Sequence, residues 1–204
     1  MSRRRGLFIA IEGIDAVGKK TQTFMLKSWL DSKGLTSRTF SFPAYDTVIG
    51  REIRKFLAGS ASYPQQARAM LYAANRWEKV SELERLLSTN DAVIVNRYTG
   101  SNYAYGVSNG LDLDWLVSLE AGLPQPDITL VLDAPPAKIA PRRGERKDTY
   151  ERNLELQEKV RSAYLTLAGK FGWTIVDADG GVDETGRSVK KAVSKTIDAK
   201  HETV

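Results

Sequence analysis

The chain has 204 residues, of which 42% are hydrophobic and 27% are charged, so it can bury an ordinary core and is too apolar for a disordered chain. It contains no cysteine, which excludes disulfide scaffolds and cysteine zinc sites. Its single histidine, His201, lies near the C-terminal end and argues against a Ser-His-Asp triad and a multi-histidine metal site. The net charge of +5 is compatible with phosphorylated small molecules, nucleic acid or anionic lipid as partners. No apolar run approaches the ~20 residues that cross a bilayer, so we expect a cytoplasmic protein without a membrane partner.

Short runs rich in Val, Ile and Leu alternate along the chain with longer stretches of helical periodicity. We predict strands over 7–11, 38–42, 92–95, 128–132 and 174–176, and helices over 19–32, 47–57, 64–88, 113–120, 148–171 and 183–199. Several strand runs lack polar alternation, which is typical of strands buried on both faces of a parallel sheet. The pattern therefore predicts an α/β fold, a three-layer sandwich that forms one domain over residues 1–204.

The strongest motif, EGIDAVGKKT, lies between the first predicted strand and the first predicted helix. Gly13, Gly18 and Lys19 match the P-loop spacing G-x-x-x-x-G-K. The glycines let the backbone curl until several N–H groups face one anion, and the helix N-terminus adds the positive end of its dipole. We therefore predict a nucleotide phosphate site, in which the Lys19 ammonium reaches the β- and γ-phosphates. Its residues are Gly13, Ile14, Asp15, Ala16, Val17, Gly18, Lys19, Lys20 and Thr21.

One position departs from the P-loop pattern. The pattern places Ser or Thr after the lysine, and that hydroxyl holds Mg²⁺, whereas this chain has Lys20 there and a hydroxyl one residue later at Thr21. Neighbouring residues point about 100° apart around a helix, so Thr21 does not simply replace the missing hydroxyl. The sequence therefore leaves the metal ligands unknown.

Two further segments carry side chains suited to a nucleotide. On a helix, Arg68, Tyr72 and Arg76 would lie one turn apart on one face, where a ring and a guanidinium can bind a base. The same spacing also fits an ordinary helix whose aromatic side chain packs inward. Arg97 follows the third predicted strand, at the end where open α/β sheets bind ligands, and its guanidinium can hold a phosphate by two hydrogen bonds.

Together these segments resemble the thymidylate kinase family of P-loop nucleoside-monophosphate kinases. The matching pieces, in family order, are the EGID loop, Phe42-Pro43, ANRWE at 74–78, Arg97-Tyr98, GLP at 122–124, PD at 126–127 and DTYER at 148–152. The resemblance implies a five-stranded parallel sheet flanked by helices, a mobile basic lid at about 138–150 and a homodimer. It also implies transfer of the γ-phosphoryl group of ATP to dTMP, which gives dTDP and ADP, with Mg²⁺ as the usual metal.

The resemblance assigns substrate contacts to individual residues. Phe42 and Tyr72 would pack on or near the thymine ring, and Arg76 would donate to a thymine carbonyl. Asn102 matches a position that hydrogen-bonds the base in some members. The full set that would bind dTMP is Asp15, Phe42, Tyr72, Arg76, Arg97, Asn102 and Tyr105.

The remaining contacts concern the sugar and the phosphates. Asp15 would meet the sugar 3′-hydroxyl, Tyr105 would pack against the sugar, and Arg97 would hold the acceptor phosphate. Some members carry an arginine in the P-loop, where this chain has Ala16, and members without it use lid arginines instead. This lid offers three, so the residues expected to stabilise the transferring phosphoryl group are Lys19, Arg97, Arg142, Arg143 and Arg146.

A second departure accompanies Lys20, because Asn96 stands where the family has an acidic residue. An active enzyme could use the Lys20 ammonium in part of the metal's role, or could hold Mg²⁺ through phosphates, water and carboxylates such as Asp15, Glu12 or Glu151. The other interpretations are a catalytically weak nucleotide-binding homologue and a kinase of dUMP or another pyrimidine monophosphate. We expect no nucleic-acid partner, because the positive charges gather at the loop and the lid.

Overall fold

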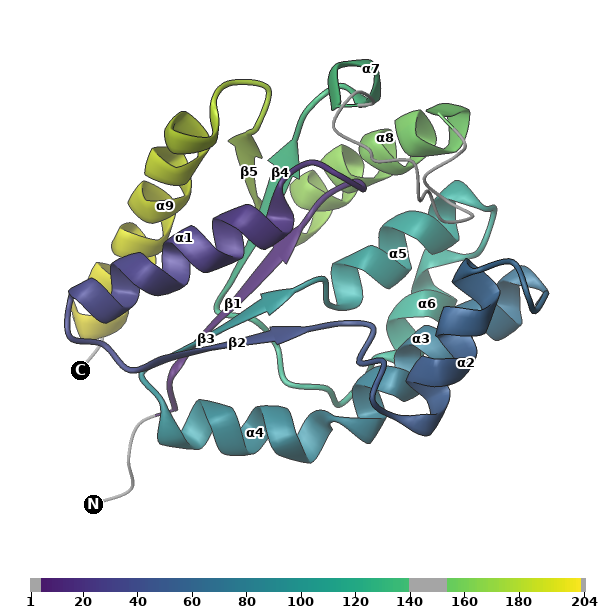
Figure 1. Ribbon diagram of the computed structural model, residues 1–204, viewed down its shortest axis with the longest axis horizontal. Coiled ribbons are helices and arrows are strands. Elements are labelled where there is room, and N and C mark those ends of the chain that lie inside the picture. Colours follow the sequence, from purple (N-terminus) through teal and green to yellow (C-terminus); the bar gives the residue numbers. More distant parts are fainter. Residues whose placement is uncertain (1–4, 140–153, 203–204) are drawn as a thin grey trace.

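The computed structural model describes residues 5–139 and 154–202, in which five parallel strands form one sheet with the order β2-β3-β1-β4-β5 (Figure 1). The strands are β1 (Leu7–Glu12), β2 (Ser37–Ser41), β3 (Ala92–Asn96), β4 (Ile128–Asp133) and β5 (Thr174–Asp177). Each predicted strand agrees with an observed one to within one residue at either end. The predicted parallel sheet flanked by helices is therefore confirmed.

Helices connect the strands and cover both faces of the sheet. They are α1 (Lys19–Ser32), α2 (Val48–Leu57), α3 (Gln65–Glu78), α4 (Val80–Thr89), α5 (Thr99–Ser108), α6 (Leu113–Leu119), α7 (Pro136–Ile139), α8 (Leu154–Phe171) and α9 (Val182–Glu202). No helix in the described ranges combines the length and the apolarity that a membrane crossing needs.

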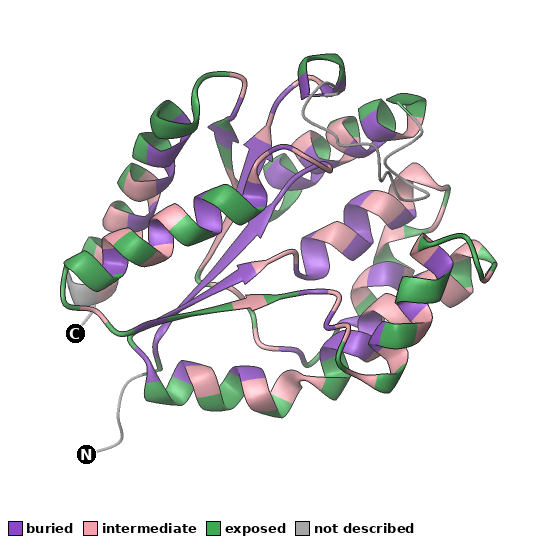
Figure 2. Cartoon of the chain, in the orientation of Figure 1, coloured by how far each residue is buried: buried purple, intermediate pink, exposed green. Residues whose placement is uncertain are grey.

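The pleat of β1 shows how the layers are arranged. Ile9 belongs to a core that includes Leu26 of α1, whereas its neighbour Phe8 packs in a second core with Leu83 of α4. Successive strand residues point to opposite faces, so α1 and α4 lie on opposite sides of the sheet. α9 lies beside α1 on the first side, and Figure 2 shows the buried residues concentrated in the sheet and on the helix faces turned toward it.

Two predicted helices differ from the structure. The segment 64–88 forms α3 and α4 rather than one helix, because the backbone leaves helical geometry at Lys79, whose φ and ψ are −110° and 4°. The segment has no Gly or Pro at this point to signal the break, and the Lys79 ammonium instead pairs with Asp46 and Glu82. The predicted helix over 148–171 is described from Leu154 onward, as α8.

The helix α5 is absent from the sequence-based prediction. It contains two glycines, Gly100 and Gly106, and glycine costs about 1 kcal/mol relative to alanine inside a helix. A contact from another element offsets this cost. The buried Glu12 carboxylate accepts hydrogen bonds from the backbone N–H groups of Tyr98 and Ser101 at the start of the helix, at 2.7 and 3.1 Å. Tertiary structure therefore decides that this segment is helical.

The start of α2 packs closely against the chain that follows β2. A β-carbon on Gly50 would clash with the carbonyl oxygen of Ala44. We therefore expect Gly50→Ala to displace α2 and to lower the free energy of unfolding by about 1–3 kcal/mol in urea denaturation. The control is Gly169→Ala in α8, where the added carbon meets nothing within 4 Å and helix propensity favours alanine. Equal stability of Gly50→Ala and wild type would contradict this packing.

Candidate active site

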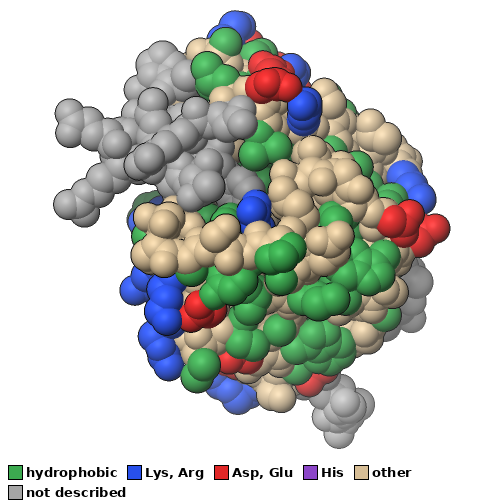
Figure 3. All heavy atoms as spheres, turned by 90° about the vertical axis from the view of Figure 1, so that its right-hand side faces the viewer, with side chains coloured by type: hydrophobic (Ala, Val, Ile, Leu, Met, Phe, Trp, Pro, Cys, Tyr) green, Lys and Arg blue, Asp and Glu red, His purple; other side chains and the backbone are tan. Residues whose placement is uncertain are grey.

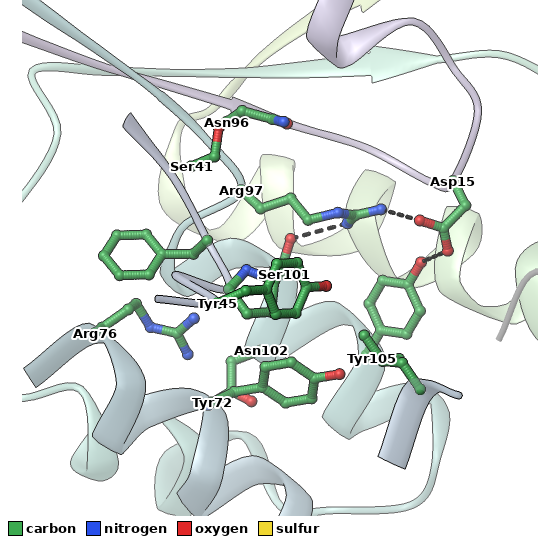
Figure 4. Close-up of a pocket in the computed structure, with 13 residues that line it drawn as sticks. Asp15, Ser41, Tyr45, Tyr72, Arg76, Asn96, Arg97, Ser101, Asn102 and Tyr105 are labelled. Carbon is green, nitrogen blue, oxygen red and sulfur yellow. Dashed lines mark hydrogen bonds and ion pairs between the residues drawn. The ribbon is translucent and has the colours of Figure 1, made fainter. Parts of the chain in front are cut away.

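Two cavities open at the carboxyl ends of the strands, where parallel sheets bind ligands. The first, the aromatic pocket, has a volume of about 340 Å³ (Figure 4). Its lining residues are Asp15, Ser41, Phe42, Pro43, Tyr45, Leu57, Tyr72, Arg76, Asn96, Arg97, Ser101, Asn102 and Tyr105. All seven residues that the resemblance assigned to dTMP are among them, although they come from four separate stretches of the chain.

The second, the loop cavity, measures about 600 Å³ and lies over the P-loop. It is lined by Asp15, Ala16, Val17, Gly18, Lys19, Lys20, Thr21, Gln22, Asn96, Arg97, Ala178, Gly180, Gly181, Val182 and Thr185. Seven of the nine predicted P-loop residues line it, and Gly13 and Ile14 are not among the lining residues. The structure therefore places the predicted phosphate site beside the aromatic pocket.

The P-loop curls through backbone conformations that favour glycine. Gly13 and Gly18 have φ values of 133° and 105°, and Ala16, at 62°, shares the left-handed region. Gly18 caps the N-terminus of α1, so the helix dipole points its positive end at the cavity. The Lys19 ammonium donates to the carbonyl oxygens of Gly13 and Ile14, at 3.0 and 2.6 Å. The loop thus brings the N-terminus of α1 and the Lys19 cation to the loop cavity.

Arg97 extends from the end of β3 toward the P-loop. Its backbone has φ 62°, a conformation uncommon for a residue with a side chain, and its guanidinium forms an ion pair with Asp15. The same guanidinium donates to Ser101 Oγ at 3.1 Å (Figure 4) and to the Gly13 carbonyl at 3.3 Å. These contacts hold the guanidinium in one orientation across the floor of the site.

The partners of Asp15 decide its charge. Burial alone would raise the pKa of Asp15, but the positive charges of Arg97 and Lys19, with hydrogen bonds from Tyr105 and Gln157, outweigh burial and lower the pKa to about 2. The same ion pair raises the pKa of Arg97 well above its usual value against the opposing effect of burial. Asp15 is therefore ionised and Arg97 protonated throughout the physiological pH range.

Two side chains that the resemblance assigned to the base share a buried carboxylate that the sequence analysis missed. Arg76 is 3% exposed, and its Nε donates to Glu120 at 2.9 Å as part of a two-point ion pair. The Asn102 amide donates to the same carboxylate at 2.7 Å and to the Ala69 carbonyl at 3.2 Å. Glu120 therefore fixes the orientation of both Arg76 and Asn102. Arg68, one turn before Tyr72, instead donates to the Tyr63 carbonyl and does not line the pocket.

The residues present do not fit the usual P-loop arrangement for Mg²⁺. Lys20 offers no oxygen, and Glu12 already accepts from two backbone N–H groups and from the hydroxyls of Ser101 and Tyr164. Within the part of the chain that the structure describes, no group of three or more His, Cys, Asp or Glu residues could hold a metal ion. The predicted lid residues Arg142, Arg143 and Arg146, and Glu151, lie outside the described residues.

Comparison with known proteins agrees with this arrangement. The sequence model of the thymidylate kinase family matches residues 11–189 of the chain. The chain belongs to the thymidylate kinase family. The resemblance inferred from the motifs is therefore confirmed.

Individual thymidylate kinases match along most of the chain. The protein from Arabidopsis thaliana is 36% identical over 189 residues, which cover 93% of this chain and 71% of that protein. A probable thymidylate kinase from Thermococcus onnurineus is 37% identical and covers 94% of this chain and 98% of its own. The solved thymidylate kinase of Candida albicans superimposes with a TM-score of 0.79 at 31% identity, covering 97% of this chain and 93% of that one.

In this member of the thymidylate kinase family, we expect loss of the buried Arg76–Glu120 ion pair to lower stability strongly. Glu120→Gln keeps the shape of the side chain but leaves the buried Arg76 charge uncompensated, which we expect to cost about 3 kcal/mol or more. Urea denaturation measures the loss. The control, Glu82→Gln, weakens a more exposed pair with Lys79 and should cost no more than ~1 kcal/mol. Similar small losses in both variants would show that Glu120 does not hold Arg76.

Asp15 predicts a pH dependence of stability. A folded pKa of about 2 against 3.8 for the free side chain means that its ionised form stabilises the fold fully above about pH 4, and that this stabilisation disappears as the pH falls through 2. We expect the free-energy difference between wild type and Asp15→Asn to stay constant from about pH 7 to 5 and to shrink by about 2 kcal/mol between pH 4 and 2. Urea titrations at each pH provide the measurement. A difference that grows on acidification would contradict the assignment.

Proposed function

We propose that this protein is a dTMP kinase that transfers the γ-phosphoryl group of ATP to dTMP and releases dTDP and ADP. One observation carries the proposal beyond family membership. The loop cavity and the aromatic pocket share the lining residues Asp15, Asn96 and Arg97. A phosphate donor in one cavity and a nucleotide acceptor in the other would therefore meet at a common point, which phosphoryl transfer requires.

The P-loop side of this junction is suited to the donor. Backbone N–H groups of the loop, the N-terminus of α1 and the Lys19 ammonium would surround the ATP phosphates. The backbone donors are already held by the loop before the reaction, so they can stabilise charge that develops on the phosphoryl oxygens without reorganising. Lys19 would exchange its contacts with the loop carbonyls for contacts with phosphate.

The aromatic pocket is suited to the acceptor. Phe42 and Tyr72 provide ring surfaces for thymine, and Arg76 and Asn102 provide polar groups for its edge. The Tyr105 hydroxyl donates a hydrogen bond to Asp15, so the sugar would contact the ring of one and the carboxylate of the other. Arg97, at the junction, would present the acceptor phosphate to the donor by two hydrogen bonds.

Other parts of the proposal rest on the family. ATP is the expected phosphate donor, and Mg²⁺ is the metal usual in the family, although the residues of this P-loop do not fit its usual ligands. The lid arginines Arg142, Arg143 and Arg146 would add positive charge as the site closes. We also propose a homodimer. Val48 of α2 and the α3 residues Met70 and Trp77 are exposed, and hydrophobic side chains gather on the side of the molecule where these helices lie (Figure 3). The cytoplasmic location stays a prediction.

An assay of ADP release with ATP and each deoxynucleoside monophosphate tests the function. We expect turnover with dTMP to exceed turnover with dUMP, by the one to two orders of magnitude that a methyl group provides in an apolar pocket. Tight dTMP binding without turnover would instead identify a nucleotide-binding protein that is not an enzyme. Preferred turnover of dUMP would overturn the assignment of the acceptor.

Arg97→Ala tests the role of the junction. Loss of the phosphate contact should lower kcat/KM for dTMP by about 100- to 1,000-fold, as removal of one preorganised donor does in other enzymes. Circular dichroism and urea denaturation check that the variant folds. The control is Arg85→Ala, on the exposed face of α4, which should keep wild-type activity. Unchanged kcat/KM in Arg97→Ala would exclude Arg97 from the reaction.

A further inference from the structure

Asn96 and Gln22 line the loop cavity, and each carries a buried side-chain oxygen that has no donor among the described residues. Only Asn96 also lines the aromatic pocket. It ends β3 and pairs in register with Ser41 of β2, and Figure 4 shows it beside Ser41 while Arg97 extends toward Asp15. Its Oδ1 atom is buried and accepts no hydrogen bond from the described part of the chain. Buried carbonyl oxygens nearly always have a donor, so we expect the donor to come into place with a ligand.

Lys20, in α1, lines the loop cavity together with Asn96. It lies in the first turn of the helix, and its side chain is exposed. The P-loop pattern has a hydroxyl here that ligates Mg²⁺. An ammonium group has three N–H donors and no lone pair, so Lys20 cannot ligate a metal, but it can donate to phosphate oxygens and to a carbonyl oxygen at once.

The acidic residues at this place are already engaged. Asp15 is the only acidic side chain among the described residues that line the loop cavity, and it accepts from Arg97, Tyr105 and Gln157. Glu12, the last residue of β1, is fully buried and accepts four hydrogen bonds. Neither carboxylate can turn toward a metal without leaving a buried donor or an arginine unpaired.

We propose that the Lys20 ammonium binds the ATP phosphates in place of the metal that a P-loop hydroxyl would hold, and that Asn96 Oδ1 accepts a hydrogen bond from this ammonium in the nucleotide complex. The inference rests on the proposed function, because it concerns the same donor site. It accounts for both unusual residues together: a metal-bound hydroxyl is replaced by a fixed cation, and the neutral amide orients that cation without cancelling its charge. The lysines of the loop and Arg97 then face the phosphates as three positive charges.

The consequence is that ATP binding depends little on divalent cations. In a site that recognises the metal–nucleotide complex, removal of the metal leaves excess negative charge and lowers affinity. Here the Lys20 charge belongs to the protein and stays when the metal is removed. Lys20→Ser restores the hydroxyl of the P-loop pattern and removes that charge, so it should make ATP binding depend on Mg²⁺.

Isothermal titration calorimetry of the full chain with ATP, in EDTA and in Mg²⁺, tests this directly and needs no turnover. We expect the wild-type Kd to differ by less than about threefold between the two buffers. Lys20→Ser should bind ATP about tenfold or more weakly in EDTA and recover much of that loss in Mg²⁺. Lys33→Ser, with the same change in charge at the other end of α1, should match wild type in both buffers.

Asn96→Ala tests the pairing. It should weaken ATP binding in EDTA, and the double variant with Lys20→Ser should bind about as weakly as Lys20→Ser alone, because both changes remove one interaction. Additive losses would overturn the pairing of Asn96 with Lys20. If Asn96→Ala does not fold by circular dichroism, the Lys20→Ser comparison still decides the role of the ammonium.

Three results would overturn the role of Lys20. They are a large loss of wild-type affinity in EDTA, an EDTA affinity of Lys20→Ser equal to that of wild type, and a Thr21→Val variant that loses about tenfold in Mg²⁺ but not in EDTA. The last would show that the neighbouring hydroxyl ligates the metal. Failure of the proposed function looks different, because it appears in the ADP-release assay, as no turnover with dTMP or as preferred turnover of dUMP, and leaves the pattern of the ATP titrations unchanged.

Discussion

The site depends on the hydrogen bonds that the buried carboxylate of Glu12 accepts. Glu12 is the last residue of β1 and directly precedes the P-loop, so its position also sets where the loop begins. It accepts from the backbone N–H groups of Tyr98 and Ser101, which follow Arg97 in the chain. Gly100 allows the close approach, since a β-carbon there would lie 3.0 Å from the carboxylate oxygen. One side chain therefore joins the P-loop to α5, which contributes Ser101, Asn102 and Tyr105 to the aromatic pocket.

Arginines at this site are held by carboxylates before any substrate binds. Arg97 pairs with Asp15, and Arg76 pairs with Glu120, in each case in a largely buried environment. Burying two charges costs desolvation energy, so such pairs do not necessarily add stability. They do restrict long side chains to one orientation. A guanidinium that is already fixed loses less conformational entropy when a phosphate or a base arrives, and its binding energy can serve transfer instead.

The P-loop of this chain differs from the general pattern in the source of its positive charge. Phosphoryl transfer requires positive charge beside the phosphate oxygens, and the pattern meets this requirement with a metal held by a hydroxyl. This chain places Lys20 at the hydroxyl position and a neutral Asn96 at the end of β3. Both features move the local charge in the positive direction. Despite these two residues, the chain belongs to the family, has the expected fold and contains the aromatic pocket.

Local patterns in the sequence were sufficient for the sheet, the P-loop and the family. Buried strands read as continuous apolar runs, and the P-loop depends on contiguous residues from Gly13 to Lys19, so both are visible along the chain. Seven of the thirteen residues that line the aromatic pocket were predicted to bind substrate, because a family resemblance links motifs that lie far apart. Spacing alone suggested Arg68 as well, which the structure directs to Tyr63 instead.

Only the tertiary structure decided which side chains meet. Glu120 binds Arg76 across 44 positions, and Gln157 reaches Asp15 across 142, and no local pattern records such partners. The same holds for α5, whose glycines disfavour a helix and whose first turn is bound by Glu12 of β1. The physical reason is that periodicity reports how one segment is buried. The pairing of buried charges, in contrast, depends on which segments the folded chain brings within hydrogen-bond distance.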